Sequence, residues 1–127
     1  MKLHGEENGK TLLAANNYAW GLLKLRRFEE AKALLRQTLP VARRVLNEGN
    51  DLLLVMRWAY ARALYQDTGA TLDDLREAVR TLEDADQIGR RVLGGTHPDV
   101  MGIADDLRLV QGLARAVLRT RETQPPS

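Results

Sequence analysis

Apolar residues recur along almost the whole chain at intervals of three and four positions, which is the spacing of one face of an α-helix. No stretch of useful length alternates apolar and polar residues with period two, so the pattern predicts no strand. Five helical segments follow from this periodicity, at about residues 11–25, 28–46, 51–67, 72–93 and 97–119. The predicted fold class is therefore all-α.

The segments between the predicted helices contain residues that end or begin helices. Asn47–Asn50 and Gly94–His97 each follow a Val-Leu pair at matching positions, and glycine suits the left-handed residue that closes a helix. Asp51 and Thr71 are suitable N-cap residues for the third and fourth helices. Pro40 lies inside the second helix, where it removes one backbone hydrogen bond. We expect a bend there and not a break, because the apolar pattern resumes in phase.

One segment of the chain occurs twice. Residues 30–46 return as residues 77–93 at a constant offset of 47, so that Arg43-Arg44-Val45-Leu46 is matched by Arg90-Arg91-Val92-Leu93. Self-similarity at such a period is typical of helical repeat arrays, in which each unit buries its apolar face on its neighbours. The sequence therefore predicts an α-solenoid of about five antiparallel helices, with two helix pairs and a C-terminal capping helix.

Several short motifs accompany this repeat at fixed spacing. Asn16-Asn17-Tyr18-Ala19 and Arg27-Phe28-Glu29-Glu30-Ala31 lie in the first unit, and His97-Pro98-Asp99-Val100 opens the third. Together they resemble tetratricopeptide repeats, in particular the longer repeats of the kinesin light chain type, over about residues 11–110. The resemblance implies a non-enzymatic scaffold that binds a protein partner, either a peptide or a helix, in a concave groove lined by the first helix of each unit.

Carried over by position, the resemblance places eight residues at this groove: Asn16, Asn17, Trp20, Lys24, Trp58, Arg62, Gln66 and Asp105. In the family, paired asparagines hold the backbone of an extended peptide, since an amide both donates and accepts hydrogen bonds. The second unit has Trp58-Ala59 in place of that pair, and the third has Asp105-Asp106. The two tryptophans are open to two interpretations, as partner contacts or as core residues.

The third unit departs from the family pattern in a way that indicates a terminal cap. Arg108 replaces the small residue that lets the two helices of a unit approach closely, and it forms a charged stripe with Arg115 and Arg119. Asp86 stands where the first unit has the apolar Leu39. Either Asp86 is exposed near the cap, or it pairs with an arginine of the last helix, because a buried carboxylate needs a partner.

The ends of the chain are assigned separately. We expect residues 1–10 to be the remnant of a preceding repeat or disordered, residues 11–121 to form the repeat domain, and residues 122–127 to be a disordered tail. Either the chain is part of a longer array or its first unit is degenerate. The alternative function is therefore self-association through the solenoid ends, or a structural spacer within a larger protein.

Composition narrows the function classes. A net charge of +2, evenly spread, argues against a nucleic-acid partner, and the longest apolar run, Leu52–Met56, is too short to cross a membrane. The chain has no cysteine, which fits a reducing compartment, and we expect a cytoplasmic location. The arginine pairs near two helix ends are open to two interpretations: favourable contact with the helix dipole, or a site for a phosphate or an acidic partner.

No arrangement of residues predicts catalysis. The only serine is Ser127, at the end of the chain, and neighbouring carboxylates such as Asp105-Asp106 point about 100° apart on a helix. His4 and His97 are too few and too far apart for a metal site. We therefore expect no enzymatic activity, no metal and no cofactor.

Overall fold

The computed structural model describes residues 5–123, with side chains described for residues 9–121. Within this part of the chain every regular element is a helix: α1 (Gly5–Lys24), α2 (Phe28–Val45), α3 (Asp51–Tyr65), α4 (Leu72–Val92) and α5 (Pro98–Thr123). Each helix packs on the next one along the chain, and α3 also touches α1 and α5. This is an all-α helical repeat solenoid, and the fold-class prediction is confirmed.

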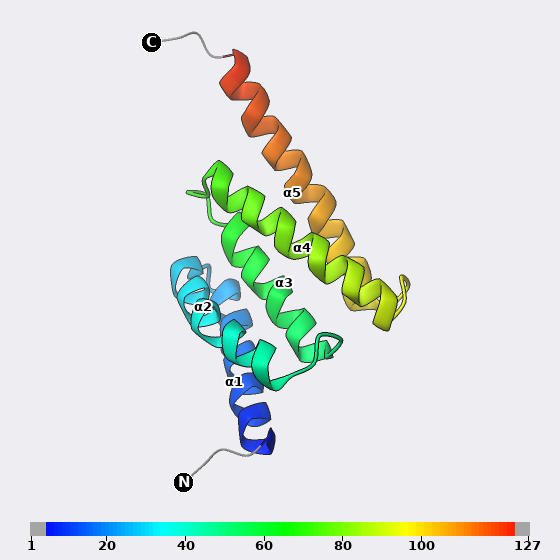
Figure 1. Ribbon diagram of the computed structural model, residues 1–127. Helices are drawn as coiled ribbons and strands as arrows, with labels where there is room; N and C mark the ends of the chain where they lie inside the picture. The colour runs from blue at the N-terminus through cyan, green and yellow to red at the C-terminus, as the bar shows by residue number, and fades with distance from the viewer. Residues whose placement is uncertain (1–4, 124–127) are drawn as a thin grey trace.

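The helices stand side by side in chain order. Figure 1 shows α1 and α2 on the left, α3 in the middle, and α4 and α5 on the right. The C-terminal part of α5 projects beyond the other helices at the top of the view. Since α5 packs chiefly on α4, this end of the solenoid lies open on one side of α5.

Helix α1 meets α2 in a tight turn of three residues. Arg26 has a φ of 61°, in the left-handed region that glycine adopts without strain. The Arg26 and Arg27 N–H groups donate to the carbonyls of Leu23 and Leu22, at 3.0 and 2.9 Å, and so close the end of α1. The guanidinium of Arg26 lies over the ring of Phe28, 5.2 Å from its centroid.

The N-terminal caps agree with the sequence in one of two cases. Thr71 caps α4 as predicted: its hydroxyl accepts from the Asp74 N–H at 3.1 Å, and the Asp74 carboxylate accepts from the Thr71 N–H at 2.9 Å. The predicted cap Asp51 is wrong, because Asn50 holds that position and accepts from the Leu52 N–H at 2.8 Å. Helix α2 continues through Pro40, so the prediction that this proline does not break the helix is confirmed.

The described helices extend past the limits expected for the repeat domain. Helix α1 runs from Gly5 to Lys24 in the described part of the chain, so residues 5–10 belong to the same helix as residues 11–24. Helix α5 reaches Thr123 and so includes the first two residues of the expected tail. Residues 1–4 and 124–127 lie outside the described part of the chain, and the predictions for them remain predictions.

The core is built from an apolar stripe on each of α1, α2, α4 and α5 and from the central helix α3, which is buried on most of its sides. Its largest fully buried side chains include Leu22 on α1, Leu35 on α2, Met56 on α3, Leu82 on α4 and Ile103 on α5. Buried alanines on α1 to α4 lie between them and let the helices approach closely. Burying a leucine, isoleucine or methionine side chain contributes about 1.5–3 kcal/mol each, so this continuous core stabilises the stack.

Two predictions about the last repeat change. Asp86 neither lies exposed nor pairs with α5: its carboxylate accepts from Arg90 Nε on its own helix, at 3.0 and 3.1 Å. Arg108 is exposed, as the capping interpretation requires. Helix α5 is nevertheless not a purely polar cap, because it also exposes Met101 and Leu109 on one side and Leu118 on another.

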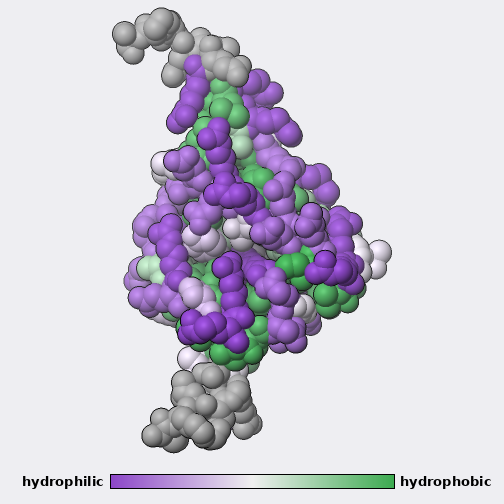
Figure 2. Space-filling model, in the orientation of Figure 1, coloured by the Kyte–Doolittle hydropathy of each residue, from purple (hydrophilic) through white to green (hydrophobic). Residues whose placement is uncertain are grey.

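The visible surface is predominantly hydrophilic. Figure 2 shows hydrophilic side chains over most of one face, with hydrophobic ones in small groups and along the projecting end of α5. Among the described residues, no helix combines the length and the hydropathy needed to span a membrane.

Candidate functional site between α3 and α5

Four side chains from three helices form one cluster, which we call the tryptophan–arginine cluster: Trp20 of α1, Trp58 and Arg62 of α3, and Asp106 of α5. The two tryptophan rings meet edge to face, with centroids 5.4 Å apart and planes at 81°. The Arg62 guanidinium lies 5.5 Å from the Trp20 centroid and 5.1 Å from the Trp58 centroid. Aromatic and cation–π contacts of this kind tie α1 to α3.

Asp106 connects this cluster to α5. One carboxylate oxygen, Oδ2, accepts from Trp58 Nε1 at 2.7 Å and from Arg62 Nε at 2.8 Å. Asp106 is only 8% exposed, so its charge depends on these two donors. Hydrogen bonds to an ionised carboxylate are short and strong, and Asp106 therefore fixes the position of both α3 side chains.

Gly102 allows α5 to approach α3 closely at this point. A Cβ atom at Gly102 would lie 2.5 Å from the ring of Trp58, a distance that real Cβ contacts do not show. The indole is held by Asp106 and cannot move without losing its hydrogen bond. Only glycine therefore fits beneath Trp58 in this arrangement.

The surroundings of Arg62 and of the neighbouring Tyr65 raise the pKa of both side chains. Burial alone would lower the pKa of Arg62. The hydrogen bond to Asp106 and the negative charge of that carboxylate together outweigh burial, so the pKa of Arg62 is raised above its ordinary value. Burial raises the pKa of the neighbouring Tyr65 to about 12, with a further contribution from the charge of Asp106. Arg62 thus stays charged and Tyr65 stays a neutral hydroxyl.

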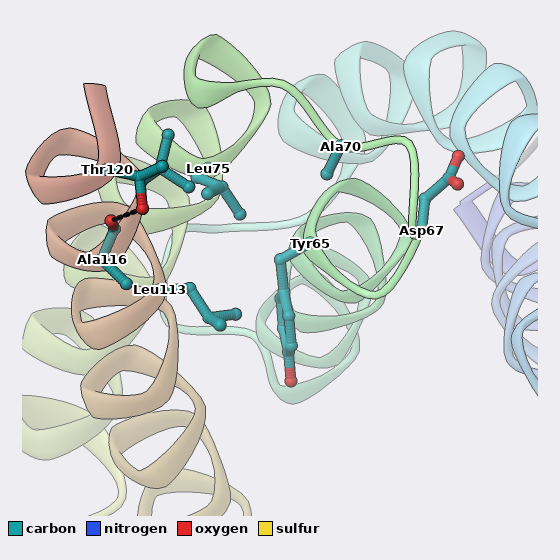
Figure 3. A pocket seen from close by; sticks show the side chains of 8 residues that line it. Tyr65, Asp67, Ala70, Leu75, Leu113, Ala116 and Thr120 are labelled. Atoms are coloured by element: carbon teal, nitrogen blue, oxygen red, sulfur yellow. Dashed lines mark hydrogen bonds between the residues drawn. The ribbon is translucent and has the colours of Figure 1, made fainter. Parts of the chain in front are cut away.

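Next to the cluster, α3 and α5 diverge and leave a pocket of about 280 Å³, which we call the α3–α5 pocket. Figure 3 shows Leu113 projecting from α5 toward Tyr65 of α3, with Leu75 of α4 close by. The residues that line the pocket are Tyr65, Asp67, Ala70, Leu75, Leu113, Ala116, Val117 and Thr120. The lining is mainly apolar, and Tyr65 joins it to the tryptophan–arginine cluster.

The outer half of α5 is also rich in arginine, although no arginine lines the pocket itself. Between Leu107 and Arg121 the helix has four arginines and no acidic residue: Arg108, Arg115, Arg119 and Arg121. Leu109, Leu113 and Leu118 are exposed on the same stretch. This part of α5 therefore presents apolar and cationic groups together.

The structure brings together three of the eight residues that the sequence placed at the groove. Trp20, Trp58 and Arg62 meet in the tryptophan–arginine cluster, and both tryptophans are partly buried against the core. The core interpretation of the tryptophans therefore accounts for most of their surface.

The other five predicted residues do not converge. Asn16 is buried while Asn17 and Lys24 are exposed, so the asparagine pair does not share one face. Gln66 ends α3, and its N–H donates to the Arg62 carbonyl at 2.9 Å. Asp105 is exposed and pairs with Arg108 on its own helix. A binding role for any of these residues remains a prediction.

Two buried atoms on α1 lack hydrogen-bond partners within the described residues: Asn16 Oδ1 and Trp20 Nε1. They lie one helical turn apart, an acceptor followed by a donor. An unsatisfied buried polar atom is costly, so these two atoms mark the place on α1 where an ordered water or a partner group is most favoured.

Sequence reasoning missed Asp106 and Tyr65. The signal for Asp106 was present, because the offset of 47 aligns it with Ala59, a small residue at a buried position of the preceding repeat. A carboxylate at a buried position requires a partner. The motif match pointed instead to Asp105, one residue earlier, as the groove residue.

Comparison with known families agrees with the helical repeats seen in the structure. A family model described as tetratricopeptide repeat matches residues 11–50, which include most of α1 and all of α2. No curated protein and no solved structure matches the chain. The match supports a tetratricopeptide-type repeat protein, while the kinesin-light-chain subtype remains a prediction. Tetratricopeptide repeats generally mediate protein–protein interaction and are typically non-enzymatic.

Among the described residues, no group of three or more histidine, aspartate and glutamate side chains is arranged to hold a metal ion. The polar groups of the candidate site are instead used in contacts between helices.

Proposed function

We propose that this chain is a non-enzymatic protein-interaction module that binds a peptide or a helix of a partner protein at the α3–α5 pocket. The observation that carries the proposal is the pocket itself, an apolar cavity beside the arginine-rich outer half of α5. The repeat class supports the general role, and the pocket supports the location.

The chemistry of the pocket defines the partner. Leu75, Leu113 and Val117 offer apolar surface to an apolar side chain, and complete burial of one such side chain contributes about 1.5–3 kcal/mol. No arginine lines the pocket, but the arginines on the other sides of the outer half of α5 favour carboxylates in a segment that extends beyond it, since a guanidinium binds them with two parallel hydrogen bonds. The proposed partner segment therefore carries an apolar anchor next to acidic residues.

This proposal moves the binding surface away from the residues first expected. Trp58 and Arg62 hold helices together, so a partner that used them would have to break the bonds to Asp106. Asn17 and Lys24 on α1 stay available as peripheral contacts. The main contact surface is the pocket at the opposite end of the array.

Peptide selection tests the proposal and does not depend on the identity of the partner. Random peptides displayed on phage are selected on the wild-type chain, and binding of the selected peptides is measured by calorimetry. We expect apolar residues flanked by acidic ones in the selected peptides, and at least about a tenfold loss of affinity for Leu113→Gln, equal to about 1.4 kcal/mol.

Leu109→Gln is the matched control, because Leu109 is exposed on the same helix but does not line the pocket. The control should bind selected peptides like the wild type. Equal affinity of both variants and the wild type, or NMR shift changes confined to Asn17 and Lys24, would contradict the pocket assignment.

Self-association is the second candidate function, favoured by the exposure of Met101 and Leu109 on the outer side of α5. Light scattering with the same two variants separates the candidates. A dimer that Leu109→Gln converts to a monomer supports association through the solenoid end. A monomeric wild-type chain excludes it at the concentration measured.

A further inference from the structure

A second pocket, also of about 280 Å³, lies between α2, α3 and α4 and shares no residue with the α3–α5 pocket. Its lining is mainly polar: Arg43, Arg57, Glu77, Arg80, Thr81 and Asp84. We propose that this pocket binds an oxyanion of the phosphate type. The proposal is independent of the protein-interaction function and concerns a different surface.

Arg57 is the central group of this site. It is only 6% exposed, and its hydrogen bond with the protein runs from Nη2 to Glu48 Oε1, at 2.9 Å. Its Nε atom is buried and has no partner within the described residues. A guanidinium offers five N–H donors, and an unsatisfied donor on a buried cation is costly. An oxygen ligand at the pocket would satisfy donors that the protein leaves open.

Arg43 of α2 and Arg80 of α4 reach the same pocket from both sides of α3. In the described part of the chain neither has a hydrogen bond or an ion pair. Both are exposed, so they can turn toward a bound anion. Three guanidinium groups from three helices thus converge on one cavity.

The carboxylates of the pocket do not cancel this charge. Glu77 accepts from the Tyr60 hydroxyl at 2.6 Å, and Tyr60 accepts from Arg36 Nε at 3.2 Å. The charge of Glu77 is thereby balanced by Arg36, through the Tyr60 hydroxyl. In the same way, Glu48 balances the charge of Arg57. Asp84 remains opposite Arg43 and Arg80, which leaves an excess of one positive charge around the cavity.

The internal repeat supplies a natural comparison for Arg43. By the offset of 47, Arg43 corresponds to Arg90, which pairs with Asp86 on its own helix. Asp86 corresponds to Leu39, so Arg43 has no carboxylate one turn before it. Arg43 lies in the last turn of α2, where the helix dipole favours its charge, and it also lines the pocket without an ion pair among the described residues.

Titration with inorganic phosphate, followed by NMR of the arginine Nε–H signals, tests the site directly. Ionic strength is held constant with sodium chloride, because exposed charges are screened by salt. We expect a saturable shift of the Arg57 Nε signal, and at least tenfold weaker binding for Arg80→Gln. Arg44→Gln removes the same charge from a residue outside the pocket and should bind phosphate like the wild type.

Replacement of Arg57 itself is avoided, since loss of a buried ion pair can unfold the chain. A shift that does not saturate, or an equal loss in Arg44→Gln and Arg80→Gln, would overturn the proposal. Phosphoserine distinguishes the two sources of the ligand. If phosphoserine binds as tightly as inorganic phosphate or more tightly, the pocket is assigned to a phosphate group on a partner. If phosphoserine binds more weakly, the pocket is assigned to the free anion. Both results support an oxyanion site.

Discussion

The two junctions between successive repeats are built differently. At the first, α1 packs along α3, and the aromatic pair Trp20 and Trp58 lies between them. At the second, α5 meets α3 over a much shorter length, around Trp58, Gly102 and Asp106. Beyond Asp106 the two helices diverge and the α3–α5 pocket opens. Side-chain packing thus holds the first junction together, and the hydrogen-bonded Asp106 carboxylate holds the second.

The connections between the helices also differ between the two junctions. Three residues, 25–27, join α1 to α2, whereas six residues, 66–71, join α3 to α4. Helix α4 is also longer than α2, with 21 residues against 18. Two residues of the longer connection, Asp67 and Ala70, line the α3–α5 pocket, and α5 packs mainly on α4.

Removal of the anchor has the largest expected effect. Asp106→Ala leaves the Trp58 N–H without its acceptor and Arg62 without its carboxylate, which should lower the free energy of unfolding by about 3 kcal/mol. Urea denaturation followed by circular dichroism measures this loss.

Asp105→Ala is the matched control, since it removes the neighbouring carboxylate from an exposed pair with Arg108. An exposed ion pair contributes little, so the free energy of unfolding should change by less than about 0.5 kcal/mol. Similar losses in the two variants would show that Asp106 does not hold the second junction together.

The next effect concerns how close α5 comes to α3. Gly102→Ala places a methyl group against the Trp58 ring and should lower the free energy of unfolding by about 1–3 kcal/mol. Gly112→Ala, on the same helix, meets no atom within 4 Å and should raise it by about 0.5–1 kcal/mol through helix propensity. Thermal or urea unfolding compares the pair. A stabilising effect at both positions would mean that α5 does not approach Trp58.

The sequence predicted the helices well because the signals for them are local. Apolar spacing placed all five helices, and Thr71 marked the start of α4 from its own side chain. The first predicted helix did not include residues 5–10 of α1, since these residues are mostly polar and carry no apolar stripe.

The candidate site was predicted only in part, because it depends on how helices far apart in sequence are placed. Trp58 and Arg62 were both placed at the groove, with a core position as the alternative for Trp58, and the Asp106 carboxylate that binds them lies more than forty residues further along. The repeat aligned Asp105 with Trp58 and Asn16, although one step along a helix turns a side chain by about 100°. Asp106 therefore faces inward while Asp105 faces water, a distinction that a motif match does not make.

The smallest effect at neutral pH, and the last test of the comparison, comes from Tyr65, whose pKa rises to about 12 at the open end of the second junction. The unfolded chain releases this proton near the ordinary value of 10.0, so above that pH the unfolded state gains stability that the native state does not. The contribution of Tyr65 is complete below about pH 10 and is lost as the pH rises to about 12. Urea denaturation across this range should show a shallower fall for Tyr65→Phe than for the wild type. Tyr18→Phe serves as the control. Tyr18 is exposed on α1, so this change should leave the fall in the free energy of unfolding with pH the same as in the wild type. If the free energy of unfolding falls equally steeply for Tyr65→Phe and the wild type, the Tyr65 hydroxyl is hydrated and water enters the α3–α5 pocket as far as Asp106.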